Sequence, residues 1–359
     1  MDDLSSYLAS LPSSLPSCTS FVIGNEACDL DSVISNIVYA YYLTITTQII
    51  TLPIVCVVKE DLRLRTEIVY FLKKMEVDLD GLLFLDTPGV AKLREKDGIS
   101  VSLVDHNKCS NVLQLKSHNI LNIVDHHVDE SDDVEGEKVI EMVGSCCTLI
   151  GDQLLTSFEI SEISEDIRML LYSTILLDTI NLDWDKGRTT DKDVKMVATL
   201  DCSDLLLVKN IYSELLEAKI DISDLSPYDL LRKDTKSVFE GGVRCFIASI
   251  TGINVEMFME RSPDEGVERF VRENNADLLI VMLAHHSEAG FERFLLVPYG
   301  FERIDGVEGF MDDLIEKVDL VVYEGYDDVY HHRKVKESRK LVLPLVKAWL
   351  KKGSVKGEL

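Results

Sequence analysis

The sequence lacks the features that would place the protein in a membrane. None of its apolar runs reaches the length of about 18 to 20 residues that a transmembrane helix requires. Its first four residues, Met1-Asp2-Asp3-Leu4, include two acidic residues and no basic one, whereas a secretory signal begins with basic residues and continues into an apolar core. These absences lead us to expect a cytoplasmic protein without a membrane partner.

The sequence also lacks the cysteine pairs of a structural zinc site. Its eight cysteines are scattered, mostly through apolar stretches, and no CxxC pair occurs. We therefore expect reduced thiols in the core, as in a reducing compartment. The adjacent Cys146 and Cys147 leave metal binding as the alternative for that pair.

Basic residues are scarce in this chain. There are 37 Lys and Arg residues against 63 Asp and Glu residues, and the formal net charge is −26 at pH 7. A surface this acidic argues against nucleic acid or anionic membranes as main partners. An anionic substrate stays open, because a local basic patch can oppose the overall field. Part of the acidic excess is expected to bind metal, and most of it to be solvated surface.

What the sequence does contain is an alternation of strand and helix patterns. Its 359 residues, 46% of them hydrophobic, are enough for two separate cores. The alternation predicts an α/β fold with a doubly wound, mostly parallel sheet, followed by a second, smaller α/β domain. The expected parts are an irregular lead-in (1–20), a first domain (21–190), a helical linker (191–225) and a second domain (226–359).

The individual elements follow from the same patterns. Strands are predicted at 21–25, 53–58, 82–85, 100–104 and 120–124, and again at 243–250, 278–283 and 294–297. Helices are predicted at 64–75, 145–155, 166–180, 190–200, 205–219 and 339–352. A further helix is predicted to begin at a cap, Asp31 or Ser32, and to continue to about Thr46.

Carboxylates and imidazoles end the apolar runs of the first domain at four places. They are Asp29 with Asp31, Asp105, Asp125 with His126 and His127, and Asp178. The carboxyl ends of parallel strands share the edge where α/β folds bind ligands. Such donors suit Mg²⁺ or Mn²⁺ and tolerate Co²⁺, and Asp105 is placed to bridge two cations about 3.5–4 Å apart. Taken singly, an aspartate at a strand end is more often a helix cap or turn residue than a metal ligand. Asp178 resists that explanation best, because its neighbours are apolar and an unpaired charge there would be costly to bury.

Four segments resemble, in order, the motifs of the DHH phosphoesterase superfamily. They are Gly24-Asn25-Glu26-Ala27-Cys28-Asp29-Leu30-Asp31-Ser32, Val104-Asp105-His106-Asn107, Val124-Asp125-His126-His127 and Leu177-Asp178. The most similar subgroup is that of the exopolyphosphatases and Prune-type proteins, which are related to the family II inorganic pyrophosphatases.

The resemblance implies a site with two divalent cations, Mg²⁺ or alternatively Mn²⁺ or Co²⁺. The first would be held by Asp29, Asp105 and Asp178. The second would be held by Asp31, Asp105, His126 and Asp178. The implied reaction is in-line attack of a water on the terminal phosphorus of a phosphoanhydride.

Other residues of the motifs are implied to form the substrate pocket. His127 would face the phosphate, His106 and Asn107 would line the same pocket, and Asp125 would orient a histidine. The chain departs from the family II pyrophosphatases at Asn25, where they carry histidine. An amide is a poorer transition-metal ligand than imidazole, which favours Mg²⁺ and the exopolyphosphatase side. The third motif is intact, whereas Prune-type proteins can alter it, and this supports catalysis.

The second domain carries two basic clusters that resemble the DHHA2 domain. Asp234-Thr235-Lys236 followed by Phe239 matches its opening motif, and Ser338-Arg339-Lys340 matches its closing one. The resemblance implies that phosphate oxygens are bound by Lys236, Arg339 and Lys340, with Arg232 and Lys233 extending the contact. Plain solvated surface is the alternative for both clusters.

Three functions stay open at this point. They are an exopolyphosphatase acting on short polyphosphate, an inorganic pyrophosphatase, and a Prune-like regulatory protein that acts mainly through protein partners. Relatives that act on nucleic acids carry a Gly-Gly-Gly-His-like motif, whereas Gly241-Gly242 is followed here by Val243. Two histidine pairs outside the motifs are expected to be surface or loop residues: His285-His286 and His331-His332.

Overall fold

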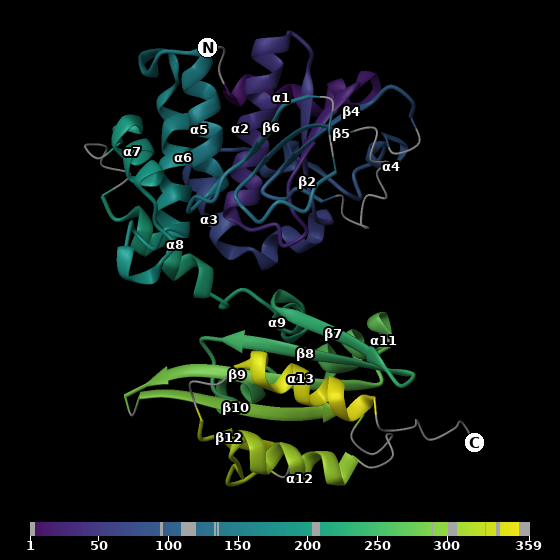
Figure 1. Cartoon of the computed structure of the whole chain (residues 1–359). Coiled ribbons are helices and arrows are strands. Elements are labelled where there is room, and N and C mark those ends of the chain that lie inside the picture. The colour runs from purple at the N-terminus through teal and green to yellow at the C-terminus, as the bar shows by residue number, and fades with distance from the viewer. Residues whose placement is uncertain are drawn as a thin grey trace. The chain divides into compact units, whose positions relative to one another are not determined.

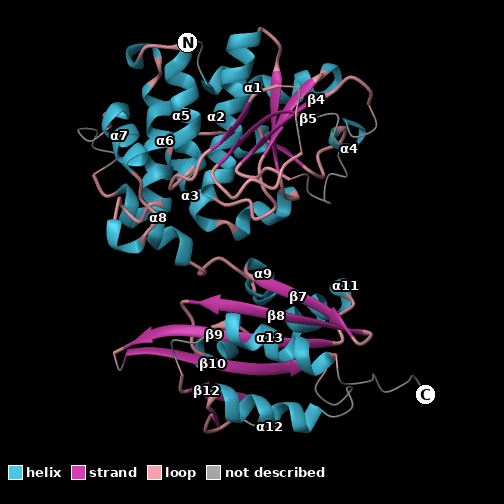
Figure 2. Ribbon diagram, viewed as in Figure 1, coloured by secondary structure: helices cyan, strands magenta, loops and turns pink. Residues whose placement is uncertain are grey.

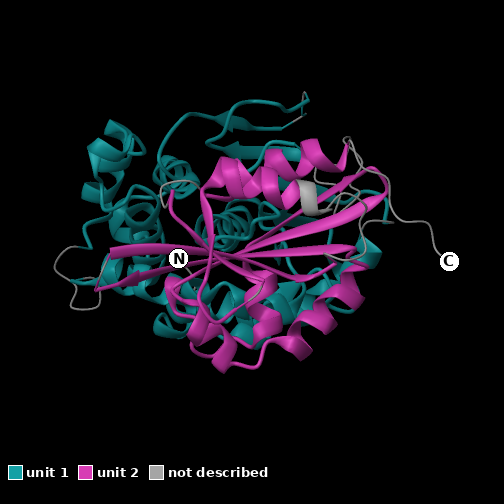
Figure 3. Cartoon of the chain, turned by 90° about the horizontal axis from the view of Figure 1, so that it is seen from below, with its two compact units in different colours: residues 1–219 teal, residues 220–359 magenta. Residues whose placement is uncertain are grey.

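The computed structural model of the chain divides into two compact units, residues 1–219 and 220–359 (Figures 1 and 3). The residues described are 4–93, 96–108, 120–132, 134, 136–202, 209–288, 290–300, 307–326, 328–334 and 338–351. Within these ranges, no helix combines the length and the apolar character needed to span a bilayer.

A parallel sheet forms the centre of the first unit (Figure 2). Its strands are β1 (Ser20–Ile23), β2 (Thr51–Val55), β3 (Leu83–Phe84), β4 (Ser100–Val104), β5 (Ile120–Asp125) and β6 (Lys138–Ile140). The order is β3-β2-β1-β4-β5-β6, and each neighbouring pair runs parallel. The chain moves outward from β1 to β3 and then returns to place β4 on the other side of β1. The carboxyl ends of β1 and β4 therefore flank a topological switch point, where such sheets bind ligands. The predicted doubly wound, mostly parallel sheet is confirmed.

Helices pack on this sheet and on one another. They are α1 (Leu4–Ser14), α2 (Leu30–Thr47), α3 (Thr66–Lys74), α4 (Val90–Leu93), α5 (Cys146–Ser157), α6 (Glu165–Asp178), α7 (Asp191–Leu200) and α8 (Ile211–Ile220). Short 3₁₀ turns lie between them: η1 (Leu15–Ser17), η2 (Lys59–Leu64), η3 (Leu79–Gly81), η5 (Ile160–Glu162) and η6 (Trp184–Lys186). Helix α2 packs on β1 and β2 through buried side chains such as Ile34 and Ile37, and α5 and α6 pack against α2 (Figure 1).

The prediction of an irregular lead-in is wrong, because residues 4–14 form helix α1. Leu4, Leu8 and Leu11 recur at helical spacing and are buried in the core of the first unit. The serines that suggested irregular chain fit the helix because their hydroxyls donate to carbonyls one turn earlier, as Ser14 does to Ser10 at 3.0 Å. Only residues 1–3 of the predicted lead-in lie outside the described ranges.

The prediction of a separate helical linker is also wrong for its larger part. Helix α7 packs against α5 and α6, and it buries Met196 and Leu200 in the first core. Helix α8 contributes Ile211 and Leu215 to the same core. The apolar faces of these helices have their partners in the first unit, whose boundary therefore falls at 219 and not at 190.

The second unit is built on a mixed sheet, which confirms the predicted second α/β unit. Its strands are β7 (Thr235–Glu240), β8 (Val243–Thr251), β9 (Leu278–Ser287), β10 (Gly290–Tyr299), β11 (Leu320–Val322) and β12 (Val329–His332). The order is β11-β12-β10-β9-β8-β7, and β8 with β9 is the parallel pair among these strands. Strands β7, β11 and β12 were not predicted, since each is short or only partly apolar.

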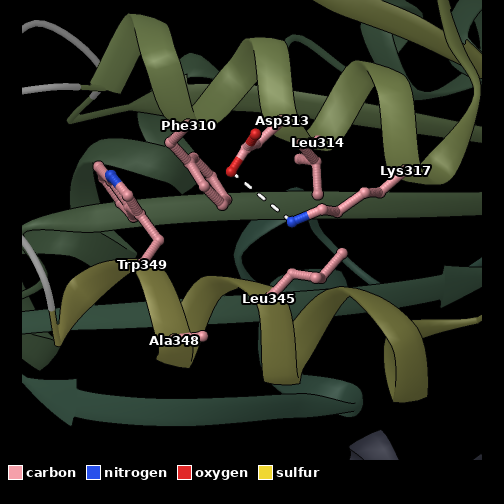
Figure 4. A pocket seen from close by; sticks show the side chains of 7 residues that line it. All are labelled: Phe310, Asp313, Leu314, Lys317, Leu345, Ala348 and Trp349. Carbon is pink, nitrogen blue, oxygen red and sulfur yellow. Dashed lines mark ion pairs between the residues drawn. The ribbon is translucent and has the colours of Figure 1, made fainter.

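Helices cover both faces of this second sheet (Figure 3). They are α9 (Pro227–Lys233), α10 (Val255–Glu260), α11 (Asp264–Asn274), α12 (Val307–Val318) and α13 (Arg339–Leu350). Between α12 and α13 the rings of Phe310 and Trp349 stack at 4.2 Å, and Lys317 lies 3.7 Å from Asp313 at the other end of the same small pocket (Figure 4). This contact ties α13, which begins at the predicted phosphate-binding Arg339, to the rest of the unit.

The expectation of a surface or loop position is wrong for His332, although it holds for the exposed His286. His332 lies in β12 and is 1% exposed. Both of its ring nitrogens lack a hydrogen-bond partner among the residues that the structure describes. Burial, together with the positive charges of Arg293 and Lys334, lowers the pKa of His332 to about 4.

We expect the second unit to lose stability as the pH falls from about 6.5 toward 4. In this window the unfolded chain protonates His332, whereas the folded chain does not, so the free energy of unfolding falls with pH. His332→Phe should reduce this loss. The two tryptophans lie in different units, so fluorescence of Trp349 in a Trp184→Phe background reports unfolding of the second unit alone. His286→Phe is the matched exposed control, and an unchanged pH dependence in His332→Phe would contradict the prediction.

Candidate metal centre

The first carboxylates of the site are held by the start of helix α2. Asp29, and not the predicted Asp31 or Ser32, is the N-cap, and its Oδ1 accepts from the backbone N of Ser32 at 3.1 Å. The preceding Cys28 has a φ of 50°, a left-handed conformation that turns the chain sharply between β1 and α2. Asp31 lies in the first turn of the helix. Both carboxylates thereby reach the carboxyl end of β1.

Asp31 is 3% exposed and its two oxygens are bound by the start of another helix, α5. Its Oδ1 accepts from Ser145 Oγ at 2.8 Å and from Cys147 N at 2.9 Å, and its Oδ2 accepts from Cys146 N at 2.6 Å. Ser35 Oγ lies 3.3 Å from Oδ1. Free backbone N–H groups at a helix N-terminus favour an anion. The adjacent cysteines thus contribute to the site through their backbone N–H groups, which bind Asp31. Burial raises the pKa of both thiols.

Asp105 and His126 face each other at the ends of β4 and β5. Asp105 is 2% exposed, has a φ of 61°, and its Oδ1 lies 3.1 Å from His126 Nε2. Asn25 Nδ2 donates to Asp105 Oδ2 at 2.6 Å. His126 Nδ1 lies 2.9 Å from the carbonyl oxygen of Val143, which can only accept, so Nδ1 carries the hydrogen. This leaves Nε2 directed at Asp105 and, 3.6 Å away, at Asp31 Oδ2.

A second hydrogen-bonded group surrounds Asp125, the last residue of β5. Asp125 Oδ1 accepts from His127 Nδ1 at 2.8 Å, and its Oδ2 accepts from Asn107 Nδ2 at 2.5 Å. Burial opposes ionisation of Asp125, but these donors lower its pKa below the ordinary value. The same hydrogen bond raises the pKa of His127, whose side chain is 56% exposed. His106 Nδ1 lies 2.9 Å from the carbonyl oxygen of Val104.

One open pocket of about 460 Å³ brings the predicted metal-binding residues together. Those that line it are Asn25, Asp29, Asp31, Asp105, His126, His127 and Asp178. His106, Asn107 and Asp125 are not among its lining residues. Asp125 accepts a hydrogen bond from His127, which does line the pocket, and Asn107 donates to Asp125. Asp105, His126 and His127 present ligand atoms within 4.8 Å of one another.

Asp178 gives the clearest sign that a cation fits this pocket. It is the last residue of helix α6, not a strand end, and its Oδ2 is buried without a hydrogen-bond partner among the described residues. Burial and the charges of Asp31 and Asp29 raise its pKa well above the ordinary value. An orphaned carboxylate oxygen beside three other carboxylates and an imidazole matches the donor set of Mg²⁺ or Mn²⁺.

The pKa values of the other ligands show the same crowding. Burial and the neighbouring Asp31 raise the pKa of Asp29, and the same two causes raise that of Asp105 to about 8. Burial alone would lower the pKa of His126, but the hydrogen bond to Asp105 and the charge of Asp31 raise it to about 10. So many buried charges of one sign are unfavourable unless protons or cations neutralise them.

The pocket also contains residues that the sequence analysis missed. They are Met142, Val143, Gly144, Gly187, Arg188, Thr189 and Thr190. Arg188 places a positive charge at the rim of an otherwise acidic site. The Thr190-x-x-Asp193 capping pattern that begins α7 is visible in the sequence. Nothing in the pattern indicates that the start of this helix lines the pocket.

The predicted phosphate contacts of the second unit have the following positions. Arg339 donates from Nη2 to Asp234 Oδ1 at 2.6 Å and from Nη1 to the Asp234 carbonyl oxygen at 2.7 Å. Arg232 lies over the ring of Tyr228 at 4.6 Å. The remaining predicted contacts are partly buried or exposed lysines: Lys233, Lys236 and Lys340.

Comparison with known proteins assigns both units to families. Residues 19–175 match the model of the DHH family, N-terminal domain, and residues 213–349 match the DHHA2 domain. A Schizosaccharomyces pombe protein named "Putative exopolyphosphatase" is 34% identical, with 94% of this chain and 92% of that protein covered. Human "Exopolyphosphatase PRUNE1" is 33% identical over 73% of this chain and 58% of that protein, so the match spans little more than half of this relative's length.

More distant likeness extends to pyrophosphatases. A "Manganese-dependent inorganic pyrophosphatase" of Methanocaldococcus jannaschii is 24% identical over 77% of this chain and 86% of that protein. The crystal structure of a Methanococcus jannaschii "putative family II inorganic pyrophosphatase" superposes with a TM-score of 0.52 at 20% identity, covering 92% of this chain and 99% of that one. The last match shows the fold alone. From the motifs, the two matched domains and the long alignment with the yeast protein, the chain belongs to the DHH family, in the group whose second domain is DHHA2.

Proposed function

We propose that the protein is a metal-dependent exopolyphosphatase that releases phosphate from the end of short inorganic polyphosphates. The observation that carries the proposal is the convergence of four aspartates and His126 on one pocket, with Asp178 Oδ2 buried and unpartnered among the described residues. The names of two relatives above 30% identity add support, because both contain the word exopolyphosphatase.

The proposed cofactor is a pair of divalent cations, Mg²⁺ first and Mn²⁺ or Co²⁺ as alternatives. Asp29, Asp105 and Asp178 would hold one. Asp31, Asp105, His126 and Asp178 would hold the other. When bound, such ions lower the pKa of a coordinated water and neutralise phosphate oxygens.

The protein's own groups would bind the substrate and manage its charge. His127, which Asp125 keeps protonated through their hydrogen bond, would donate to a phosphate oxygen. Arg188 would add a positive charge at the rim of the pocket. In the second unit we propose Lys236, Arg339 and Lys340 as phosphate contacts, with Arg232 and Lys233 extending them. Because Asp234 occupies one edge of the Arg339 guanidinium, the remaining N–H groups would be presented in a fixed orientation.

The test is phosphate release from tripolyphosphate and from pyrophosphate, measured side by side in Mg²⁺, Mn²⁺ and Co²⁺. We expect faster release from tripolyphosphate, because that preference distinguishes an exopolyphosphatase from a pyrophosphatase. A preference for pyrophosphate would select the inorganic pyrophosphatase instead. No release from either substrate with any of the three metals would refute the proposed hydrolase activity. The remaining possibility would be a regulatory protein that acts through protein partners.

We expect Asp125→Asn to move the alkaline limb of the pH profile of kcat/KM to lower pH. The Asp125 carboxylate raises the pKa of His127, so its removal lets His127 lose its proton at lower pH. The variant should therefore lose more activity at pH 8 than at pH 6. His127→Gln should abolish this limb, and adding Asp125→Asn to it should then change the profile no further. A limb that stays in place in the single Asp125 variant would argue against the role of His127.

A further inference from the structure

Helix α7 carries a buried carboxylate that makes no hydrogen bond to a predicted metal ligand but bonds to the segments that hold those ligands. Asp193 lies in the first turn of α7 and has no exposed surface. We infer that Asp193 is a positioning residue of the metal centre: it fixes residues 143–147, which orient the ligands Asp31 and His126. The inference deepens the proposed function and rests on it.

The carboxylate of Asp193 joins two elements by four hydrogen bonds. Its Oδ1 accepts from Thr148 Oγ1 at 2.6 Å. Its Oδ2 accepts from Gly144 N at 2.9 Å, from Thr190 N at 2.8 Å and from Thr190 Oγ1 at 2.7 Å. The bonds to Thr190 form an ordinary capping box for α7. Those to Gly144 and Thr148 reach a different element, the start of α5, and capping does not require them.

Residues 143–147 in turn bind two of the proposed ligands. The Val143 carbonyl oxygen accepts from His126 Nδ1 and so sets which ring nitrogen faces the pocket. The side chain of residue 145 and the backbone N–H groups of residues 146 and 147 donate to Asp31. A shift of this segment by a few tenths of an ångström would move both ligands together, because all these contacts are direct hydrogen bonds.

Gly144 shows how closely the surrounding segments meet at this point. A Cβ atom there would lie 2.5 Å from the carbonyl oxygen of Arg188, 2.5 Å from Thr179 Cγ2 and 2.8 Å from Asp193 Oδ2. Thr179 directly follows the proposed ligand Asp178, and Arg188 lines the pocket. Asp193 therefore lies at the junction of the segments that carry or orient Asp31, His126, Asp178 and Arg188.

The experiment compares Asp193→Ala with Asp193→Asn in the full chain. The readout is the dissociation constant for Mn²⁺, measured by electron paramagnetic resonance, with circular dichroism as the check of folding. We expect the alanine variant to bind Mn²⁺ about 10- to 100-fold more weakly, as is typical when support of a metal ligand is lost. The asparagine variant should stay close to wild type, because its amide oxygen can accept from Gly144 and Thr190 while its NH₂ donates to Thr148.

Asp229→Ala is the matched control for loss of a buried cap. Asp229 is also fully buried and closes a capping box with Ser226, but at helix α9 of the second unit. Asp229→Ala should leave the affinity for Mn²⁺ unchanged. The comparison therefore separates the effect of losing any buried helix cap from the effect of losing support at the metal centre.

The metal centre and the positioning role of Asp193 can fail separately. Wild-type protein that binds no Mn²⁺ would refute the metal centre itself. Wild-type binding together with equally tight binding by Asp193→Ala would overturn the positioning role, as would an asparagine variant as weak as the alanine one. If Asp193→Ala does not fold, Thr148→Val is the second variant, because it replaces the hydroxyl that donates to Asp193 Oδ1 by a methyl group. Wild-type affinity for Mn²⁺ in that variant would overturn the inference.

Discussion

Asp105→Asn should lower phosphate release from tripolyphosphate by at least about a thousandfold, which is about 4 kcal/mol of transition-state stabilisation. Asp105 is the proposed ligand shared by both cations, and its Oδ1 lies 3.1 Å from His126. Asparagine keeps the size of the side chain and tolerates the left-handed backbone at φ 61°. What it removes is the negative charge that would bridge two cations. The loss should therefore come from chemistry and not from misfolding.

The chain offers a control with the same backbone conformation. Asp201 has a φ of 47°, ends helix α7 and is exposed, and it does not line the pocket. Asp201→Asn repeats the chemical change at a left-handed residue outside the site, so its rate should equal that of the wild type. Rates and thermal midpoints measured for both variants separate catalysis from stability. An Asp105→Asn enzyme that retains more than about a tenth of the wild-type rate would remove Asp105 from the proposed bridging role.

The part of the site that the sequence could indicate is the part carried by strand ends. Asp29, Asp105 and Asp125 each follow or end an apolar run, and parallel strands place such ends at one edge. The strand patterns predict this edge. His126 and Asp178 also follow from the residues, because each lies at the end of an apolar run, and the motif resemblance only divided the ligands between two cations. The pocket indeed contains the expected ligands, although Asp178 comes from the end of a helix.

The rest of the site depends on contacts between residues far apart in the chain. Nothing near Asp193 in the sequence indicates that its side chain meets Gly144, or that the amides of Cys146 and Cys147 bind Asp31. The same limit explains the missed burial of His332. Periodicity predicts which face of an element is apolar, but not which polar group another element will cover.

Helix α1 was missed for a different reason: the prediction there relied on the Ser and Pro content and not on the spacing of the apolar residues. Its serines and Pro12 suggested irregular chain, whereas Leu4, Leu8 and Leu11 follow the helical repeat and are buried. Burial of three leucines favours folding by several kcal/mol, at about 1.5–3 kcal/mol each, and this exceeds the weak helix preference lost at the serines. A count of apolar positions at the helical period would have found this helix.

Binding of Mn²⁺ to the metal-free protein should strengthen by about tenfold per pH unit for each proton displaced, as the pH rises from 6 to 8. Burial and neighbouring carboxylates raise the pKa of Asp105 to about 8 and keep that of Asp178 well above its ordinary value. In the metal-free protein these carboxyls therefore hold protons that a cation must displace, because ligands must be deprotonated to bind metal. Calorimetric titration in two buffers of different ionisation enthalpy counts the protons released.

The stability of the metal-free protein should change with pH in the opposite direction to its affinity for Mn²⁺. A carboxyl whose pKa is raised by folding stabilises the metal-free fold below the unfolded value, near 3.9, and this contribution is lost as the pH rises through the folded value. The metal-free first unit should therefore weaken between about pH 4 and 8, and Mn²⁺ should raise its thermal midpoint more at pH 8 than at pH 6. Asp105→Asn should release fewer protons and show a smaller difference between the two pH values. Equal proton release by wild type and variant would mean that Asp105 is not among the groups that the cation deprotonates.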